Sequence, residues 1–235
     1  MTAKRLLLST TALELVRQRA LPAPLVLPPG FSLELTGEGS TDEAVALLRR
    51  LGVALPAGDG WTVHPGVADD LLVLGAPEVA VTVTASRPGL EVHACLALSG
   101  PRGAGLLRTG DSAVQLSAFP AVELAAELAR VVPASADAAA RPESEEVPLD
   151  MLLDGSGSRL GSRTTGTLHA TVYAGPRADR AAGLVGSVEW VWDGRAWTGL
   201  EALPSRAGRP WVRLVPVLPT DLGPWVASLV ARAAA

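Results

Sequence analysis

A pattern near the C-terminus repeats one found earlier in the chain, and this repeat constrains the fold more than any other feature. VRLVPVLPTDLGPWVASLV covers residues 212–230, and VQLSAFPAVELAAELARVV covers residues 114–132. Aligned without a gap, Val114 falls on Val212, and each later position follows in the same register. In both segments a short alternating strand precedes a proline, an acidic residue and an amphipathic helix. Two halves of related structure are therefore predicted.

The segments before these helices correspond as well. Four strand-like runs in the first half read EVAVTVTA, LEVHACLAL, GAGLLRT and SAVQLSAF, and four in the second read TGTLHATVYA, VGSVEWVWD, AWTGLEAL and RPWVRLVPVL. The separators are turn sequences, and Asp193-Gly194 is among the strongest two-residue hairpin signals. A short helix is expected before each set of strands, VHPGVADDLLVLG in the first half and VPLDMLLDG in the second.

This organisation predicts a single α+β domain built from two halves related by a pseudo-twofold axis. Each half is expected to contain a short helix, a four-strand antiparallel meander and a closing helix. The halves span about residues 60–132 and 147–231. The segment between them, 133–146, is rich in Ala, Pro, Ser and acidic residues and is predicted to be a linker.

An N-terminal helical extension is predicted before the first half. MTAKRLLLSTTALELVRQRA is typical of an amphipathic helix rather than of a signal peptide, because Glu14 interrupts its apolar stretch. STDEAVALLRRLGV predicts a second helix, since Ser40 or Thr41 can cap it and its charges suit the helix dipole.

Composition limits the classes of function. Of the 235 residues, 48% are hydrophobic and 19% charged, as in an ordinary globular domain. The net charge of −4 argues against a nucleic-acid partner, since phosphate binding needs a basic face. Cys95 is the single cysteine, which leaves no internal disulfide and no multi-cysteine zinc site. No apolar run is long enough to cross a bilayer, so a cytoplasmic location is predicted.

The motifs predict no catalytic, cofactor or metal site. Cys95 and His93 lie two positions apart and share a strand face, but a buried inert cysteine is more common than a dyad of this kind. His64 and His169 fall in a turn and in a strand. DGSGSRLG, residues 154–161, follows a predicted helix and lacks the Gly-Lys-Ser/Thr ending of a phosphate loop. We therefore expect a protein that is not an enzyme.

Tryptophans are concentrated in the second half. The first half contains Trp61 only, and the second contains Trp190, Trp192, Trp197, Trp211 and Trp225. We expect most of them to fill the core of a half that is poor in Phe and Tyr. At least one is also a candidate anchor for a protein partner, because Trp is enriched at the energetic centres of interfaces.

Several segments together resemble the EspG family, the chaperones associated with ESX (type VII) secretion in actinobacteria. ALELVRQRALPAPLVLP is similar to the family's opening helix and Leu-Pro segment, and STDEAVALLRRLGV to the helix that follows. GWTVHPGVADDLLVLGAPEVAVTV resembles the short helix that leads into its first strand. VEWVWDGRAWTGL resembles its hairpin with an Asp-Gly-Arg turn, and VRLVPVLPTDLGPWVASLV its closing strand and helix.

The resemblance implies a quasi-twofold α+β fold with a central antiparallel sheet and helical bundles. It also implies a cytosolic, non-enzymatic role, in which the protein binds the helical tip of a PE/PPE-type protein and keeps it soluble for export. No cofactor is implied. Partner contacts would lie on the sheet of the second half and on the C-terminal helix, with Trp190, Trp192, Trp197 and Trp225 as candidate anchors.

Two other interpretations stay open on the sequence alone. The chain could be an enzyme or a small-molecule-binding protein with a pocket between the halves, which predicts a polar cluster around His93, Cys95 or His169. It could instead be a structural homodimer, joined through the sheet edges left at the ends of the meanders.

Overall fold

The structure of the protein is a computed structural model. It describes residues 4–29, 31, 39–108, 110, 113–134, 143–153, 164–176 and 183–235. The predicted loop at 154–161, and residues 135–142 of the predicted linker, lie outside these ranges.

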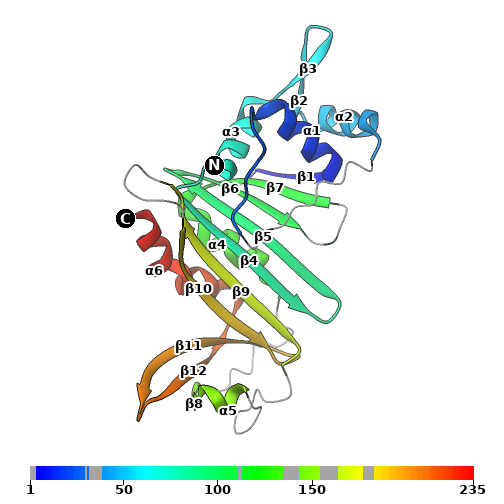
Figure 1. Cartoon of the computed structure of the whole chain (residues 1–235). Helices are drawn as coiled ribbons and strands as arrows, with labels where there is room; N and C mark the ends of the chain where they lie inside the picture. The colour runs from blue at the N-terminus through cyan, green and yellow to red at the C-terminus, as the bar shows by residue number, and fades with distance from the viewer. Residues whose placement is uncertain are drawn as a thin grey trace.

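One ten-stranded antiparallel sheet runs through the molecule in the order β1-β7-β6-β5-β4-β9-β10-β11-β12-β8 (Figure 1). Its strands are β1 Lys4–Ser9, β4 Val79–Arg87, β5 Leu90–Ser99, β6 Arg102–Arg108, β7 Ala113–Pro120, β8 Glu145–Pro148, β9 Gly166–Ala174, β10 Gly183–Trp192, β11 Trp197–Arg206 and β12 Arg209–Val217. β4–β7 and β9–β12 are the two four-strand meanders that the alternating patterns predicted. The predicted α+β class is confirmed.

The two meanders meet at β4 and β9, whose pairing makes a single sheet out of both halves. Thr82 lies opposite Thr171 in this pair. Just beyond it, the Gly175 amide donates to the Glu78 carbonyl at 2.8 Å. A side chain at position 175 would stand 1.7 Å from the Pro77 carbonyl oxygen, so only glycine fits this close approach. From this seam the strands follow outward in the same chain order on both sides, while the boundaries predicted for the halves stay predictions.

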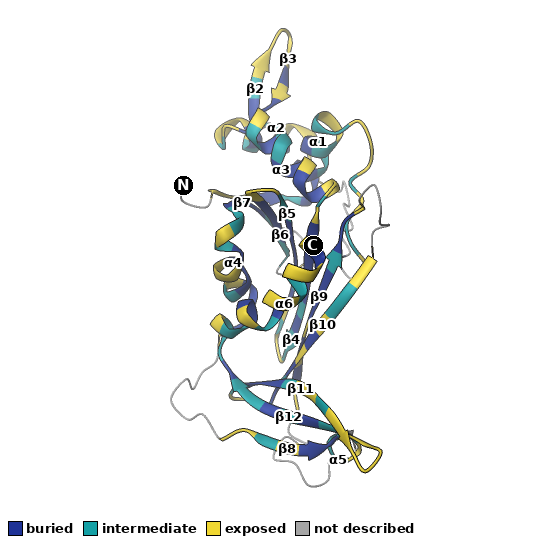
Figure 2. Cartoon of the chain, turned by 90° about the vertical axis from the view of Figure 1, so that its left-hand side faces the viewer, coloured by how far each residue is buried: buried dark blue, intermediate teal, exposed yellow. Residues whose placement is uncertain are grey.

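Helices cover both faces of the sheet (Figure 2). α4 and α6 pack on one face, against β5 and against β4, β9 and β10 respectively. On the opposite face, α1 and α3 pack at the end that contains β1, β7 and β6, with α2 against α1, and α5 packs on β12 at the other end. The helices are α1 Thr10–Ala20, α2 Thr41–Arg50, α3 Pro65–Gly75, α4 Leu124–Val131, α5 Leu149–Leu153 and α6 Leu222–Ala234, and the 3-10 turns η1 Ala121–Glu123 and η3 Pro219–Asp221 lead into α4 and α6.

A cross-strand row shows that α1–α3 and α5 share one face. His93, Thr84, His169, Glu189 and Leu200 lie directly opposite one another in successive strands from β5 to β11. Directly opposed residues point to the same side of a sheet. His93 lies two positions from the buried Cys95, which packs with α1–α3, and Leu200 packs with α5.

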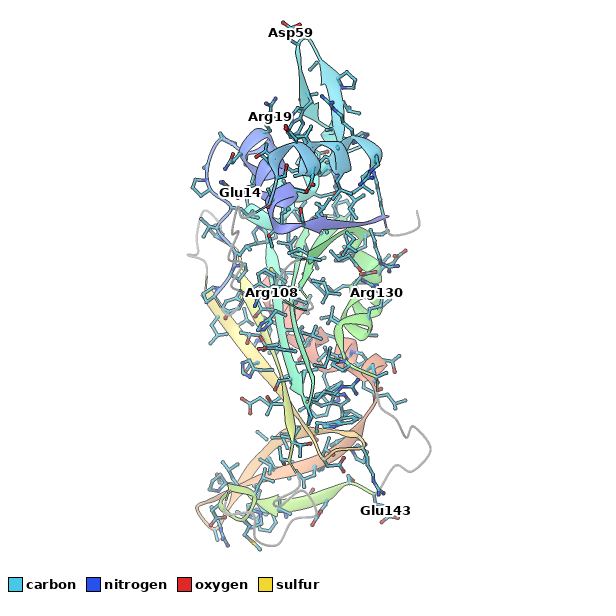
Figure 3. All side chains as sticks on the ribbon, turned by 90° about the vertical axis from the view of Figure 1, so that its right-hand side faces the viewer. Glu14, Arg19, Asp59, Arg108, Arg130 and Glu143 are labelled. Carbon is cyan, nitrogen blue, oxygen red and sulfur yellow. The ribbon has the colours of Figure 1, made fainter. Side chains whose placement is uncertain are left out.

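A two-stranded hairpin, β2 Ala54–Ala57 and β3 Gly60–Val63, projects beyond α1–α3 with Asp59 at its tip (Figure 3). The Arg19 guanidinium of α1 lies 4.4 Å from the centre of the Trp61 ring and also donates to the Trp61 carbonyl. This cation–π contact and hydrogen bond fix the base of the hairpin to α1.

The prediction of one helix over the N-terminal segment is wrong for its first part. Residues 4–9 form β1, which pairs with β7, and α1 begins only at Thr10. Leu6 and Leu8 are buried while Leu7 between them is 65% exposed, which is strand periodicity. The Ser9 hydroxyl then accepts from the Ala12 amide at 3.1 Å and caps the helix.

The short helix predicted at the start of the second half begins later than expected, and a strand precedes it. Glu145–Pro148 form strand β8 on the free edge of β12, and helix α5 starts at Leu149 rather than at 147. Val147 is buried opposite Val212, whereas Glu146 faces Arg213. The partner that makes this segment a strand lies in a distant part of the sequence.

Candidate partner-binding surface

The tryptophans named as candidate anchors lie mostly in the core. Trp190 and Trp197 are 0% exposed and Trp192 is 4% exposed, and all three pack under α4 and α6. The Trp197 indole N–H donates to the Pro133 carbonyl at 2.8 Å, and the rings of Trp192 and Trp197 are 5.2 Å apart. These three side chains therefore fill the core in the free chain, as expected for most of the tryptophans, and their role as anchors for a partner stays a prediction.

Trp225 is the half-buried member of the set and attaches α6 to the sheet. Its ring lies over Gly199 of β11, where a side chain would come within 2.4 Å of the ring. The ring also meets Trp190 edge to face at 5.9 Å and 87°. A contact between Trp225 and a partner stays a prediction.

The outer sides of η1–α4 and α6 carry small and apolar residues. We call them the α4–α6 surface; its exposed members are Val122, Ala125, Ala126, Pro224, Ala227, Ser228 and Ala231. Val122 is 92% exposed. Figure 2 shows the two helices lying side by side over the sheet. Apolar side chains gathered on an exposed face are typical of surfaces that bind other proteins.

The two helices come close together because the residues at their contact are small. A side chain at Gly223 of α6 would lie 2.6 Å from the Ala125 Cβ of α4. Short side chains at a helix contact allow the helix axes to approach. The exposed residues of the two helices also include Arg130 and Arg232, one turn from Ala126 and Ser228.

A buried ion-pair network attaches the sheet-facing side of α4 to strand β1. Glu127 is 2% exposed and receives a hydrogen bond from Arg5 of β1 at 2.7 Å and from Arg130 at 3.1 Å (Arg130 is labelled in Figure 3). Because a buried carboxylate without these partners would be strongly unfavourable, the pairs hold α4 in place relative to the edge of the sheet.

Sequence reasoning named the C-terminal helix, which is α6, as a place of partner contacts, but it did not name α4. The sequence signal for the exposed side of α4 is a set of alanines that lie between the buried positions Leu124, Leu128 and Val131. Alanines on the solvent side of a helix do not by themselves indicate a binding surface, since alanine is common on any helix.

His93 and His169 each lie next to a glutamate, and Cys95 is buried. His93 Nε2 lies 2.9 Å from Glu91 Oε1, and His169 Nδ1 lies 3.4 Å from Glu189 Oε1. Cys95 is fully buried, and burial raises the pKa of its thiol to about 12. A thiol protonated at neutral pH is not a nucleophile, so this strand holds no activated Cys–His dyad.

His64 has a structural role of its own, and the described ranges contain no metal cluster. The His64 Nδ1 accepts from the Gly66 amide at 3.1 Å and caps α3. Within the part of the chain that the structure describes, no group of three His, Cys, Asp or Glu side chains could hold a metal ion.

A cavity of about 540 Å³ lies at the seam between the halves. It is lined mainly by apolar residues, among them Val26, Pro77, Ala80, Tyr173 and Leu184. His93, Cys95 and His169 do not line it. The polar cluster that the small-molecule interpretation predicted around these three residues is therefore not part of this cavity.

The comparisons with known proteins give a likeness of fold. No family model matches the chain, and no curated protein matches it in sequence. Among solved structures, the chain is similar to the Mycobacterium tuberculosis type VII secretion system chaperone EspG5, solved in complex with the PE25–PPE41 dimer. The TM-score is 0.63 at 15% sequence identity, over 98% of this chain and 96% of the other. The α+β fold with a central antiparallel sheet that the resemblance to the EspG family implies is confirmed, while the pseudo-twofold relation between the halves stays a prediction.

Across the described ranges, none of the helices combines the length and the apolar character that a membrane span requires.

Proposed function

We propose that this chain is a cytosolic chaperone of a type VII secretion system, which binds a helical secreted protein of the PE/PPE type and keeps it soluble until export. The observation that carries the proposal is the likeness of fold, over 98% of this chain, to a chaperone solved together with a PE25–PPE41 dimer. The sequence motifs that resemble the EspG family support the same assignment.

The α4–α6 surface supplies a physical reason for such binding. An apolar helix tip is insoluble because its hydrophobic side chains face water, and covering that area is favourable. A face made mostly of alanine, proline and valine lets a helical partner approach closely. The projecting Val122 and the half-buried Trp225 ring are the larger apolar groups that this surface offers.

The first test is affinity capture of the tagged full chain from the cytosol of its native host, with mass spectrometry and the size-exclusion mass of the product. We expect one helical, exported protein in stoichiometric amount. A complex of two copies with no other protein would instead favour the homodimer interpretation. A partner-free monomer from cells with active export would contradict the proposal and direct attention to ligands of the seam cavity.

A pair of variants locates the binding face once a partner is captured. We expect Val122→Glu combined with Ala227→Glu to reduce capture at least about tenfold, because each glutamate would lose its hydration within an apolar interface. The matched control is Leu72→Glu, which places the same charge at an exposed leucine on α3. Equal loss in both variants, or in neither, would exclude the α4–α6 surface as the binding site.

A further inference from the structure

A second cavity, of about 310 Å³, lies where the start of β1 meets α3 and the strands β6 and β7 (near the N label in Figure 1). We call it the β1–α3 pocket. The apolar side chains that face α3 in it come from Val67, Pro101, Ala118 and Pro120. Gly103 and Phe119 line it from the strands, while the Phe119 ring itself packs over Gly103 on the opposite face, in the cluster under α4 and α6.

The pocket also contains a buried carboxylate without a close donor. Asp70 is 8% exposed, and its nearest described cation, Arg102 Nη2, is 3.6 Å away, beyond hydrogen-bonding distance. The closer contact of this guanidinium, at 3.0 Å, goes to Asp69. Burial raises the pKa of Asp70, and the positive charge of Arg102 offsets part of that effect. An ammonium or hydroxyl donor beside Asp70 would satisfy it.

Cationic and hydrogen-bond-donating side chains also line the β1–α3 pocket. Lys4 and Arg102 both line the pocket, and within the described ranges no side chain forms an ion pair with Lys4. His64 lines it as well; because its Nδ1 accepts from Gly66, the neutral ring carries its proton on Nε2 and can donate there.

We propose that the β1–α3 pocket binds a free α-amino acid with an apolar side chain. The ammonium group pairs with Asp70, the carboxylate lies between Lys4 and Arg102, and the side chain packs on Val67 and the prolines Pro101 and Pro120. A simple anion would face the buried Asp70, and a simple cation would face Lys4 and Arg102. Only a ligand that carries both charges and an apolar part matches all of these groups. The volume is at the lower limit of ligand pockets, which suits a molecule of this size.

Calorimetric titration of the full chain tests the proposal with chemically matched probes. L-leucine and L-phenylalanine are compared with N-acetyl-leucine, which lacks the ammonium group, and with leucine amide, which lacks the carboxylate. We expect saturable binding of the free amino acids and at least about tenfold weaker binding of each blocked probe, because each loses one charge-assisted pair. Equal binding of a blocked probe would overturn the proposal, as would no saturable binding at about 10 mM of either amino acid.

Variants then assign the two ends of the ligand. Asp70→Asn is expected to weaken binding about tenfold, and Lys4→Gln, at the exposed start of β1, several-fold. Asp59→Asn, the same chemical change at the tip of the β2–β3 hairpin, is the control and leaves binding unchanged. Each variant is first shown to unfold cooperatively and at no lower urea concentration than wild type; if Asp70→Asn fails this check, Lys4→Gln and the blocked probes decide. Unchanged affinity in Lys4→Gln together with tight binding of leucine amide would overturn the assigned orientation.

Discussion

The sheet face opposite α4 and α6 is covered at both of its ends, and the two ends are held by different forces. At one end α1–α3 enclose a large apolar cluster, which includes the fully buried Val16, Leu48 and Leu71. At the other end, among the residues that the structure describes, α5 covers a cluster with three buried members, Val147, Val212 and Leu214. By area alone, the first end gains far more from the hydrophobic effect than the second.

The α5 end compensates with exposed ion pairs. Arg209 makes a bidentate contact with Asp150 of α5, and Arg213 donates to Glu146 at 2.9 Å and to Glu201 at 3.1 Å. Pairs of this kind contribute little individually in water and weaken in salt. The helices at one end are therefore held mainly by apolar burial, whereas exposed ion pairs contribute to holding α5 at the other end. We expect the two ends to respond differently to side-chain truncation, pH and salt.

The largest loss of stability is expected for a substitution in β11, on the sheet face that α4 and α6 cover. Trp197 of β11 is fully buried under α4 and α6, so Trp197→Ala should lower the free energy of unfolding by about 3–5 kcal/mol. Urea unfolding followed by circular dichroism measures this change. Trp211→Ala, at a partly exposed tryptophan of β12, is the control and should cost less than half as much. A Trp197→Ala protein of normal stability that no longer captures a partner would restore Trp197 as an anchor.

A matched pair of leucines compares the two ends directly. Leu71→Ala in α3 removes a fully buried side chain and should cost about 2–5 kcal/mol. Leu152→Ala in α5 removes a partly exposed one and should cost about 1 kcal/mol. The same urea titration serves both. Equal losses would mean that the small cluster under α5 is as important as the large one, and the contrast between the ends would be wrong.

The two ends should also depend on pH with opposite sign. Hydrogen bonds from Arg213 and Arg206 lower the pKa of Glu146, so its contribution to stability is complete above the unfolded value and is lost as the pH falls through the folded one. Burial raises the pKa of Asp70 above 3.8, so the folded state holds that proton more tightly and this site becomes less favourable as the pH rises.

Single neutral variants separate these contributions. Relative to wild type, Asp70→Asn should be more stable at neutral pH, with the difference shrinking towards about pH 3, where Asp70 is protonated in both states. Glu146→Gln should be less stable at neutral pH, with its difference also shrinking in acid. Urea unfolding at the two pH values checks both. The same sign for the two variants would contradict the opposite electrostatic environments of the two ends.

The smallest effect is expected for a single exposed pair. Arg213→Gln removes the contacts to Glu146 and Glu201 and should raise amide hydrogen exchange of β8 modestly, while exchange in α1–α3 stays unchanged. Added salt should imitate the variant at β8, because it screens these charges. Arg108→Gln, on β6 of the same sheet, is the matched control. Faster exchange at α1–α3 would show that the ends are not independent.

Local sequence patterns were sufficient to predict the strands with clear two-residue alternation and the helices with clear helical spacing. The alternation in EVAVTVTA and LEVHACLAL predicted β4 and β5, because neighbours along a strand point to opposite faces. The helical spacing of VELAAELARVV predicted α4, and Pro65 near the first turn predicted α3. Asp193 and Gly194 form the predicted turn, with Gly194 at φ 96° and the Asp193 carboxylate accepting from the Ala196 amide at 2.9 Å.

The elements that sequence reasoning misassigned are the ones whose partner is distant in the chain. RLLLS and EEVP become strands β1 and β8 because β7 and β12 present free edges to them, and a short segment with an ambiguous pattern takes the structure of its neighbour. The burial of individual tryptophans also depends on residues that are distant in the chain. A tryptophan at 190, 192 or 197 is apolar wherever it points, and only the packing of α4 and α6 decides that these rings are covered while alanines remain outside.

The sequence by itself determined the α+β class, the order of strands within each half and the closing helix of each, because these depend on contacts between near neighbours in the chain. Tertiary structure alone decided that the two meanders join at β4 and β9, that both outer edges gain a strand, and which side chains line the α4–α6 surface and the β1–α3 pocket. Pairing across the sheet and burial between layers depend on residues far apart in sequence, and no local period encodes them.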